Sequence, residues 1–363
     1  MARKLPQDFL FPRAYFRAQA RGVAPVPAYF FHQVEPDGFE AMCAALSAKG
    51  IRTLTFSELL DGRDPGADAV LLTFDDGWSS VWSMALPIAR RHGVRLTLFA
   101  TPETMESSPE RRPGLDDGIQ PDQLVARDRG ERSLLTWGEL RGLHESGVVE
   151  IQSHSSHHGV VFTADRLTGC TGDDTPNWQS GNIPVLSRRA GIDVPVLRPP
   201  PGTPLAEVGP ALVAERRFII DEAFESDCIA RHADGHAKAA MPGDPLPGRW
   251  ESEAERDERF FDDLSRSRQR LEEELPGCRA RVLAPPWARM HPRLAPIACE
   301  AGYEVLALGY PAQDGELSTA LPTTPRLYGE GIWTLIHGPL LGTPRWLATR
   351  RLNLARRAAG AIP

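Results

Sequence analysis

The feature that most constrains the fold is a run of six residues without a charge, AVLLTF at 69–74. A strand that is apolar throughout is typical of a parallel sheet covered by helices on both faces. Similar short runs alternate with helical stretches along the chain, which predicts βα units around a mostly parallel sheet or barrel. The expected strands are 26–31, 51–56, 69–74, 95–100, 148–153, 281–284 and 303–308, and the expected helices are 39–49, a short one capped by Ser57, 79–92, 136–147, 253–275 and 292–301.

One long stretch, residues 160–250, breaks this alternation because it is rich in Pro and Gly and poor in periodicity. We interpret it as an insertion into a regular βα series. Connections of that length usually serve a function, for example as a lid or a substrate-binding segment.

Composition narrows the class of protein. The chain has 363 residues, 41% of them hydrophobic and 25% charged, with a net charge of −7. These values fit a globular protein without bulk basicity for nucleic acid, so we expect no nucleic-acid partner. Five dispersed cysteines without a CxxC pair, and no apparent signal peptide, predict a cytoplasmic location.

The sharpest chemical motif is Thr73-Phe74-Asp75-Asp76-Gly77, where two acids directly follow the apolar strand. Two adjacent carboxylates in a low-dielectric site need a cation or strong hydrogen bonds to stay ionised. One acid can then bind a metal while the other acts as a base. The alternative is an exposed turn that leads into a helix.

A second motif, His154-Ser155-Ser156-His157-His158, also follows an expected strand directly. If this segment is helical, His154 and His158 lie on one face and can bind one metal, while His157 points elsewhere. A polar turn without a ligand is the alternative. Together the two motifs offer a carboxylate and two imidazoles with coordination positions left open, which is typical of a catalytic metal site.

These motifs resemble those of the polysaccharide deacetylases, the NodB-homology group of carbohydrate esterase family four. The resemblance implies a distorted (β/α) barrel in the α/β class, here a single domain over 1–363 with the insertion at 160–250. It implies Asp75 as catalytic base and Asp76, His154 and His158 as metal ligands. The cofactor would be a divalent metal ion, with zinc expected and cobalt or nickel as alternatives. The segment 283–309 is similar to the third motif, in which Pro286 and Trp287 would form one wall of the sugar groove.

The chain departs from the family pattern at two points. Many members have an arginine in the third motif that orients the base, but the matching residue here is Ala284, so Arg281 or Arg289 would have to replace it. Many also use a late histidine as general acid. His337 in Leu335-Ile336-His337 is a loose match for that residue, and His32 is the rival candidate.

The expected reaction is hydrolysis of an N-acyl group, with acetyl expected, from an amino sugar or glycan intermediate. Two alternatives stay open: another C–N hydrolase on the same scaffold, such as a deformylase or ureide hydrolase, and a non-catalytic glycan-binding protein.

Arginines and aromatic or leucine side chains also alternate in an N-terminal arm (1–22) and a basic C-terminal tail (341–363). These termini could contact anionic lipid and make the protein membrane-associated, or the tail could be a solvated helix packed on the barrel.

Overall fold

The computed structural model describes residues 26–65, 69–128, 130, 133–172, 183–189, 191–236, 239–309 and 320–337. The N-terminal arm and the basic C-terminal tail both lie outside these residues. Among the helices that are described, none has the length and apolar character required to cross a bilayer.

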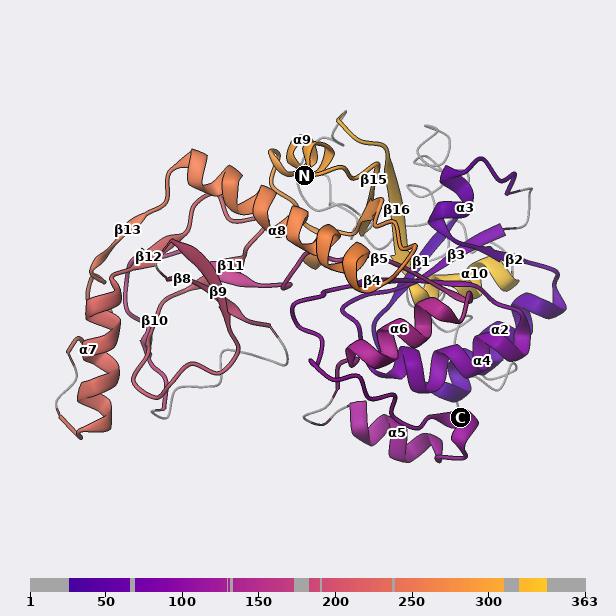
Figure 1. Ribbon diagram of the computed structural model, residues 1–363, viewed down its shortest axis with the longest axis horizontal. Helices are drawn as coiled ribbons and strands as arrows, with labels where there is room; N and C mark the ends of the chain where they lie inside the picture. The colour runs from indigo at the N-terminus through magenta and orange to yellow at the C-terminus, as the bar shows by residue number, and fades with distance from the viewer. Residues whose placement is uncertain are drawn as a thin grey trace, which may run out of the picture.

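The larger part of the molecule is a closed barrel of seven parallel strands (Figure 1). Closure comes from the first strand, which pairs with the last strand on one side and with β3 on the other. An eighth strand, β2 (Arg52–Leu54), extends the sheet outward from β3. In spatial order the barrel strands are β1 (Ala28–Phe31), β16 (Thr323–Tyr328), β15 (Val305–Gly309), β14 (Val282–Leu283), β5 (Val149–Ser153), β4 (Leu96–Ala100) and β3 (Ala69–Phe74).

Side chains of the barrel strands alternate between two cores, as the period of two requires. On β3, Leu71 belongs to the cluster inside the barrel, whereas Val70 and Leu72 belong to the cluster under the surrounding helices. On β15, Ala307 lies inside and Leu306 outside. All six residues of β3 are buried, because the strand is covered on both faces.

Helices pack around the outside of the barrel (Figure 1). One helix begins as the sequence predicts: the Thr136 side chain accepts a hydrogen bond from the Glu139 backbone N–H, which forms a capping box. The predicted cap at Ser57 is wrong, because Thr55 caps that helix instead. The helices of the barrel are α2 (Pro36–Ala48), α3 (Phe56–Leu60), α4 (Leu86–His92), α5 (Pro121–Asp128), α6 (Trp137–Glu145), α8 (Glu253–Glu274), α9 (Leu294–Glu300) and α10 (Ile332–His337).

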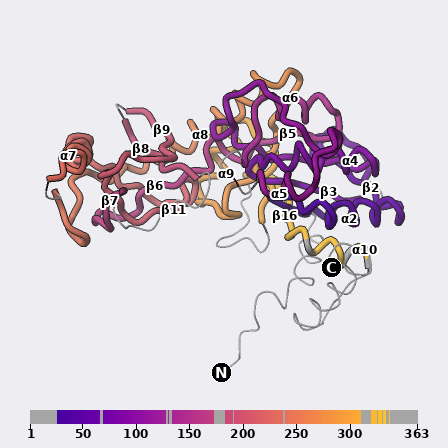
Figure 2. Tube along the Cα trace, turned by 90° about the horizontal axis from the view of Figure 1, so that it is seen from below, coloured from indigo at the N-terminus to yellow at the C-terminus, as the bar shows by residue number. Residues whose placement is uncertain are grey.

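Residues 160–250 build a lobe beside the barrel, which Figures 1 and 2 show from two directions. It contains a four-stranded sheet, two strand pairs and one helix, and α8 runs from this lobe back along the barrel. Its elements are β6 (Val160–Phe162), β7 (Gly169–Cys170), β8 (Val185–Arg189), β9 (Ile192–Val196), β10 (Pro204–Leu205), β11 (Val208–Pro210), β12 (Phe218–Ile220), α7 (Glu222–Ala233) and β13 (Gly248–Trp250).

Strand β16 is absent from the sequence prediction, which ends its strands at 308. Without β16 the barrel does not close, since it bridges β15 and β1. Its sequence, TTPRLY, contains a proline and an arginine, and both residue types argue against a buried strand.

Candidate active site

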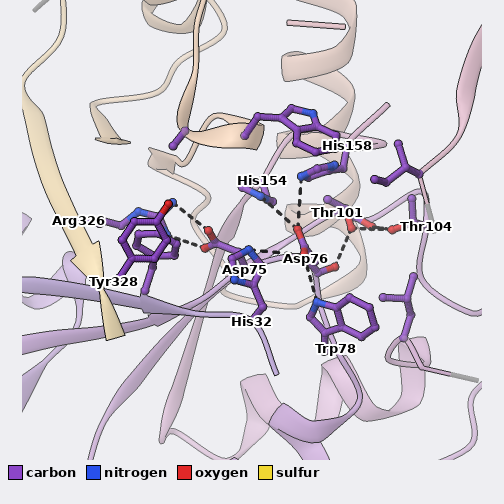
Figure 3. A pocket seen from close by; sticks show the side chains of 15 residues that line it. His32, Asp75, Asp76, Trp78, Thr101, Thr104, His154, His158, Arg326 and Tyr328 are labelled. Carbon is purple, nitrogen blue, oxygen red and sulfur yellow. Dashed lines mark hydrogen bonds and ion pairs between the residues drawn. The ribbon is translucent and has the colours of Figure 1, made fainter. Parts of the chain in front are cut away.

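The candidate site is a cavity of about 310 Å³ at the carboxyl ends of the barrel strands (Figure 3). This is the end at which barrel enzymes place their catalytic groups. The cavity is lined by residues from the ends of several strands and from the lobe: Phe30, His32, Asp75, Asp76, Trp78, Thr101, Thr104, Leu134, His154, His158, Ile183, Trp287, Ala288, Arg326 and Tyr328.

The two acids of the first motif follow β3, and their side chains point in different directions. Asp75 is 4% exposed and continues the inward alternation of the strand. Asp76 has a φ of 71° and Gly77 a φ of 89°, so the chain turns sharply at once. A side chain at Gly77 would also collide with Met105, because an added Cβ would lie 2.2 Å from its Cε. This turn separates the side chains of two neighbouring acids.

Asp76, His154 and His158 meet at one point. The Asp76 Oδ1 atom lies 3.3 Å from His154 Nε2 and 3.5 Å from His158 Nε2. One ligand atom from each residue lies within 4.8 Å of the others (Figure 3). The second oxygen, Asp76 Oδ2, accepts a 3.1 Å hydrogen bond from Trp78 Nε1, which fixes the carboxylate with Oδ1 toward the histidines.

This arrangement fits a divalent cation. Asp76 Oδ1 is a buried oxygen without a hydrogen-bond partner among the described residues. Such an atom is costly unless something else satisfies it. One carboxylate and two imidazoles are a donor set that zinc and its first-row neighbours accept.

The imidazole of His154 is oriented as metal-binding histidines usually are. His154 Nδ1 lies 2.7 Å from the Ala284 carbonyl oxygen, so Nδ1 donates the proton and Nε2 presents its lone pair toward Asp76. Burial, together with the neighbouring His154, lowers the pKa of His158 to about 4 and favours its neutral form. Burial alone would raise the pKa of Asp76, but its close contacts with the imidazoles of His154 and His158 hold that pKa well below its usual range.

The histidine segment is a loop, so the helical interpretation of His154 and His158 is wrong. Ser155 and His158 have φ values of 71° and 51°, which no α-helix contains. The two imidazoles converge because the loop folds back above β5. His157 points away from Asp76, and its Nδ1 lies 3.3 Å from Asp263 Oδ2.

The candidate catalytic base, Asp75, is held by an arginine that the sequence analysis did not identify. Arg326, on β16, places its NH1 2.5 Å from Asp75 Oδ1 and its NH2 3.0 Å from Oδ2. The guanidinium lies over the rings of Phe30 and Phe99, 5.2 and 4.8 Å from their centroids. Burial alone would raise the pKa of Asp75, but the charge of Arg326 lowers it below its ordinary value.

The expectation that Arg281 or Arg289 takes this place is therefore wrong. Arg281 pairs with Glu304 and Asp61 instead. The signal that could have identified Arg326 is its position: in TTPRLY it is a lone charge at a site that alternates with Leu327, and Leu327 packs under the outer helices. Trp78, directly after the first motif, is a second residue that the sequence analysis missed.

Two aromatic side chains border the cavity. Trp287 is 42% exposed and its ring centroid lies 4.8 Å from that of His158. Tyr328 is 60% exposed and packs on Phe30. Pro286 is buried and is not among the described residues that line the cavity. Ile183 brings the segment 160–250 into the lining.

Of the two candidate acids, His32 lies at the site. It follows β1, its side chain is half-exposed, and its Nε2 lies 3.9 Å from Asp76 Oδ2. His337 is the last residue of α10, and its side chain is outside the part of the chain that the structure describes.

Comparison with known proteins finds similarity to one family. The sequence profile named polysaccharide deacetylase matches residues 62–214. YxkH of Bacillus subtilis (strain 168), which is named as a polysaccharide deacetylase, is 23% identical over 147 residues, which are 37% of this chain and 44% of YxkH. The matched part thus spans less than half of that relative.

Solved structures with a similar chain path include a de-N-acetylase from Aggregatibacter actinomycetemcomitans and IcaB from Ammonifex degensii. The first has a TM-score of 0.47 at 15% identity and covers 90% of this chain and 98% of its own. The second has a TM-score of 0.47 at 16% identity, covering 86% and 95%. The matched stretch, residues 62–214, contains both the first and the second motif and is similar to the polysaccharide deacetylase family.

Proposed function

We propose that this protein is a metal-dependent hydrolase that removes an N-acyl group, acetyl in the first instance, from an amino sugar of a glycan or glycan intermediate. The observation that carries the proposal is the unpartnered Asp76 Oδ1, which faces the Nε2 atoms of two histidines beside a second, buried acid. Zinc is the metal we propose, with cobalt or nickel as substitutes. When bound, such a cation polarises an acyl carbonyl and makes water more acidic.

Asp75 is the general base in this proposal. Both of its oxygens accept from Arg326, but each carboxylate oxygen has a second lone pair and can take a proton from water. Arg326 keeps the carboxylate ionised and fixes its plane. Trp287 and Tyr328 form apolar walls on which a sugar ring can rest, and His32 is placed to give a proton to the leaving amine.

The non-catalytic alternative loses its support. That interpretation depended on the missing arginine of the third motif, and Arg326 supplies a guanidinium to Asp75 from a different strand. A comparison of substrates distinguishes an N-acetyl sugar hydrolase from another C–N hydrolase. We expect acetate release from N-acetylated sugars with Zn²⁺, Co²⁺ or Ni²⁺ present, and no turnover of formamides or ureides. The reverse pattern would identify the other class.

The metal site is tested by replacing its ligands. We expect His154→Ala and His158→Ala to lower affinity for Zn²⁺ by at least about 100-fold, because each removes one of three donor atoms, and loss of a group that only orients a ligand already costs about 10- to 100-fold. Titration against a chromophoric chelator measures this affinity. His144→Ala on α6 is the control, because its Nε2 bonds the Pro276 carbonyl far from Asp76. Equal affinity of all three variants and the parent would refute the site.

The role of His32 as general acid is tested with two substrates whose leaving amines differ in basicity. We expect His32→Gln to lower kcat by about 100-fold on an N-acetyl amino sugar, since general acid catalysis contributes factors of this order. On an acetanilide with an electron-poor ring, whose leaving amine needs little protonation, the loss should be much smaller. Equal losses on both substrates would mean that His32 does not protonate the amine.

A further inference from the structure

The loop between the two proposed histidine ligands has strained backbone angles. Three residues separate His154 from His158, and both Ser155 and His158 adopt left-handed backbone angles. Such angles are unfavourable for residues with a side chain and persist only when the surroundings enforce them. Five non-glycine residues of the described chain have positive φ, and four of them line this cavity: Asp76, His158, Trp287 and Ala288 line it, and Ser155 lies between the two histidines.

Asp263 on α8 provides that enforcement. Its side chain is 7% exposed and both oxygens face the loop. Oδ1 accepts a 3.0 Å hydrogen bond from the Ser156 backbone N–H, and Oδ2 lies 3.3 Å from His157 Nδ1. The Asp263 backbone carbonyl also accepts a 2.7 Å bond from the Ser156 hydroxyl. One residue thus makes three polar contacts with the two residues that precede the ligand His158.

The next turn of α8 holds the other end of the loop. The Ser267 hydroxyl lies 2.8 Å from the hydroxyl of Ser153, the residue before the ligand His154. Asp263 and Ser267 are four residues apart and therefore lie on the same face of the helix. This face of α8 therefore holds the backbone just before His154 and just before His158.

The lobe in turn fixes α8. Arg259, one turn before Asp263, bonds the fully buried carboxylate of Glu251 and the carbonyl of Ala211. Arg217 joins Glu251 to Asp193 on β9. Charges this deeply buried hold a fixed geometry because each is satisfied only by its partners. A continuous series of polar contacts therefore links the lobe, through α8, to the histidine loop.

We propose that Asp263 is a positioning residue for the metal site: it touches neither metal nor substrate, and it sets the backbone that directs His154 and His158 at Asp76. The inference rests on the proposed function, since it assigns a role toward the cation of that site. It also gives the segment 160–250 a purpose besides contact with the glycan, because that lobe anchors the helix that carries Asp263.

The test measures metal affinity and not turnover. We expect Asp263→Ala to weaken Zn²⁺ and Co²⁺ binding by about 10- to 100-fold, as removal of groups that orient metal ligands does. The visible spectrum of the Co²⁺ protein should change as well, because the imidazoles are displaced. Asp263→Asn keeps an oxygen for the Ser156 N–H and should bind metal close to the parent. Asp262→Ala, at the exposed neighbour, is the matched control.

Melting of the metal-free proteins separates positioning from folding. A lower melting temperature with unchanged metal affinity and an unchanged Co²⁺ spectrum would overturn the inference. If Asp263→Ala does not fold, His157→Phe decides, since it removes the contact that Asp263 Oδ2 makes with His157 Nδ1 and should weaken metal binding to a smaller degree. Parent-like affinity would overturn the inference. A parent protein that binds neither metal would instead refute the proposed function itself.

Discussion

Asp75→Asn is expected to slow acetate release by a factor of about 10²–10⁴ while the protein still binds zinc, because the amide cannot take a proton from water. The proposed ligands Asp76, His154 and His158 are untouched by the change, so metal affinity should stay near that of the parent. The measurement is kcat on an N-acetyl amino sugar with saturating Zn²⁺, paired with the zinc titration of the same protein.

The control for this variant is Asp61→Asn. Asp61 is an exposed acid that pairs with Arg281 away from the cavity. It should leave both kcat and zinc affinity unchanged. An Asp75→Asn protein that holds zinc and keeps more than about a tenth of the parent rate would exclude Asp75 as the base, because the smallest effect expected of a general base is larger than this.

The barrel and the meeting of the two motifs at one cavity could be predicted because their signals are local. A strand buried on both faces is apolar throughout, as 69–74 is, and the polar residues that follow such strands gather at one end of a parallel barrel. The motifs of Asp75 and His154 each lie directly after such a strand. No knowledge of distant contacts was needed to bring them together.

The remaining parts of the site depend on contacts between distant segments. Arg326 reaches Asp75 across 251 positions of sequence, and its strand contains a proline and a charge that argue against burial. The His154–His158 loop obtains its left-handed angles from α8, more than 100 positions later. Nothing within either segment indicates its partner. The lobe likewise forms short strands whose pairing is set by tertiary contacts and not by periodicity.

The contact between Arg326 and Asp75 makes the second large effect predictable. Arg326→Met is expected to lower the free energy of unfolding by about 3–5 kcal/mol, because it leaves the buried Asp75 carboxylate without its counter-charge. Urea unfolding of the metal-free protein measures this loss. Activity should fall in the same variant, since Asp75 loses both hydrogen bonds that orient it.

Arg281→Met is the matched control, because Arg281 also makes ion pairs, but with partners that are largely exposed: Asp61 is 66% and Glu304 is 48% exposed. It should cost about 0–1 kcal/mol, as surface ion pairs do. An equal loss of unfolding free energy in the two methionine variants would mean that the buried ion pair stabilises the protein no more than an exposed one does.

The double variant Asp75→Leu with Arg326→Met separates the pair's two roles. A buried ion pair that is replaced as a whole by apolar residues of similar volume often leaves stability unchanged or higher. We therefore expect the double variant to recover most of the stability that Arg326→Met loses, because no charge is left unpaired between Phe30 and Phe99. It should nevertheless release no acetate. A stable but inactive double variant would show that the pair is maintained for the chemistry of Asp75 and not for the fold, whereas a double variant as unstable as Arg326→Met would show that the pair is part of the barrel's packing.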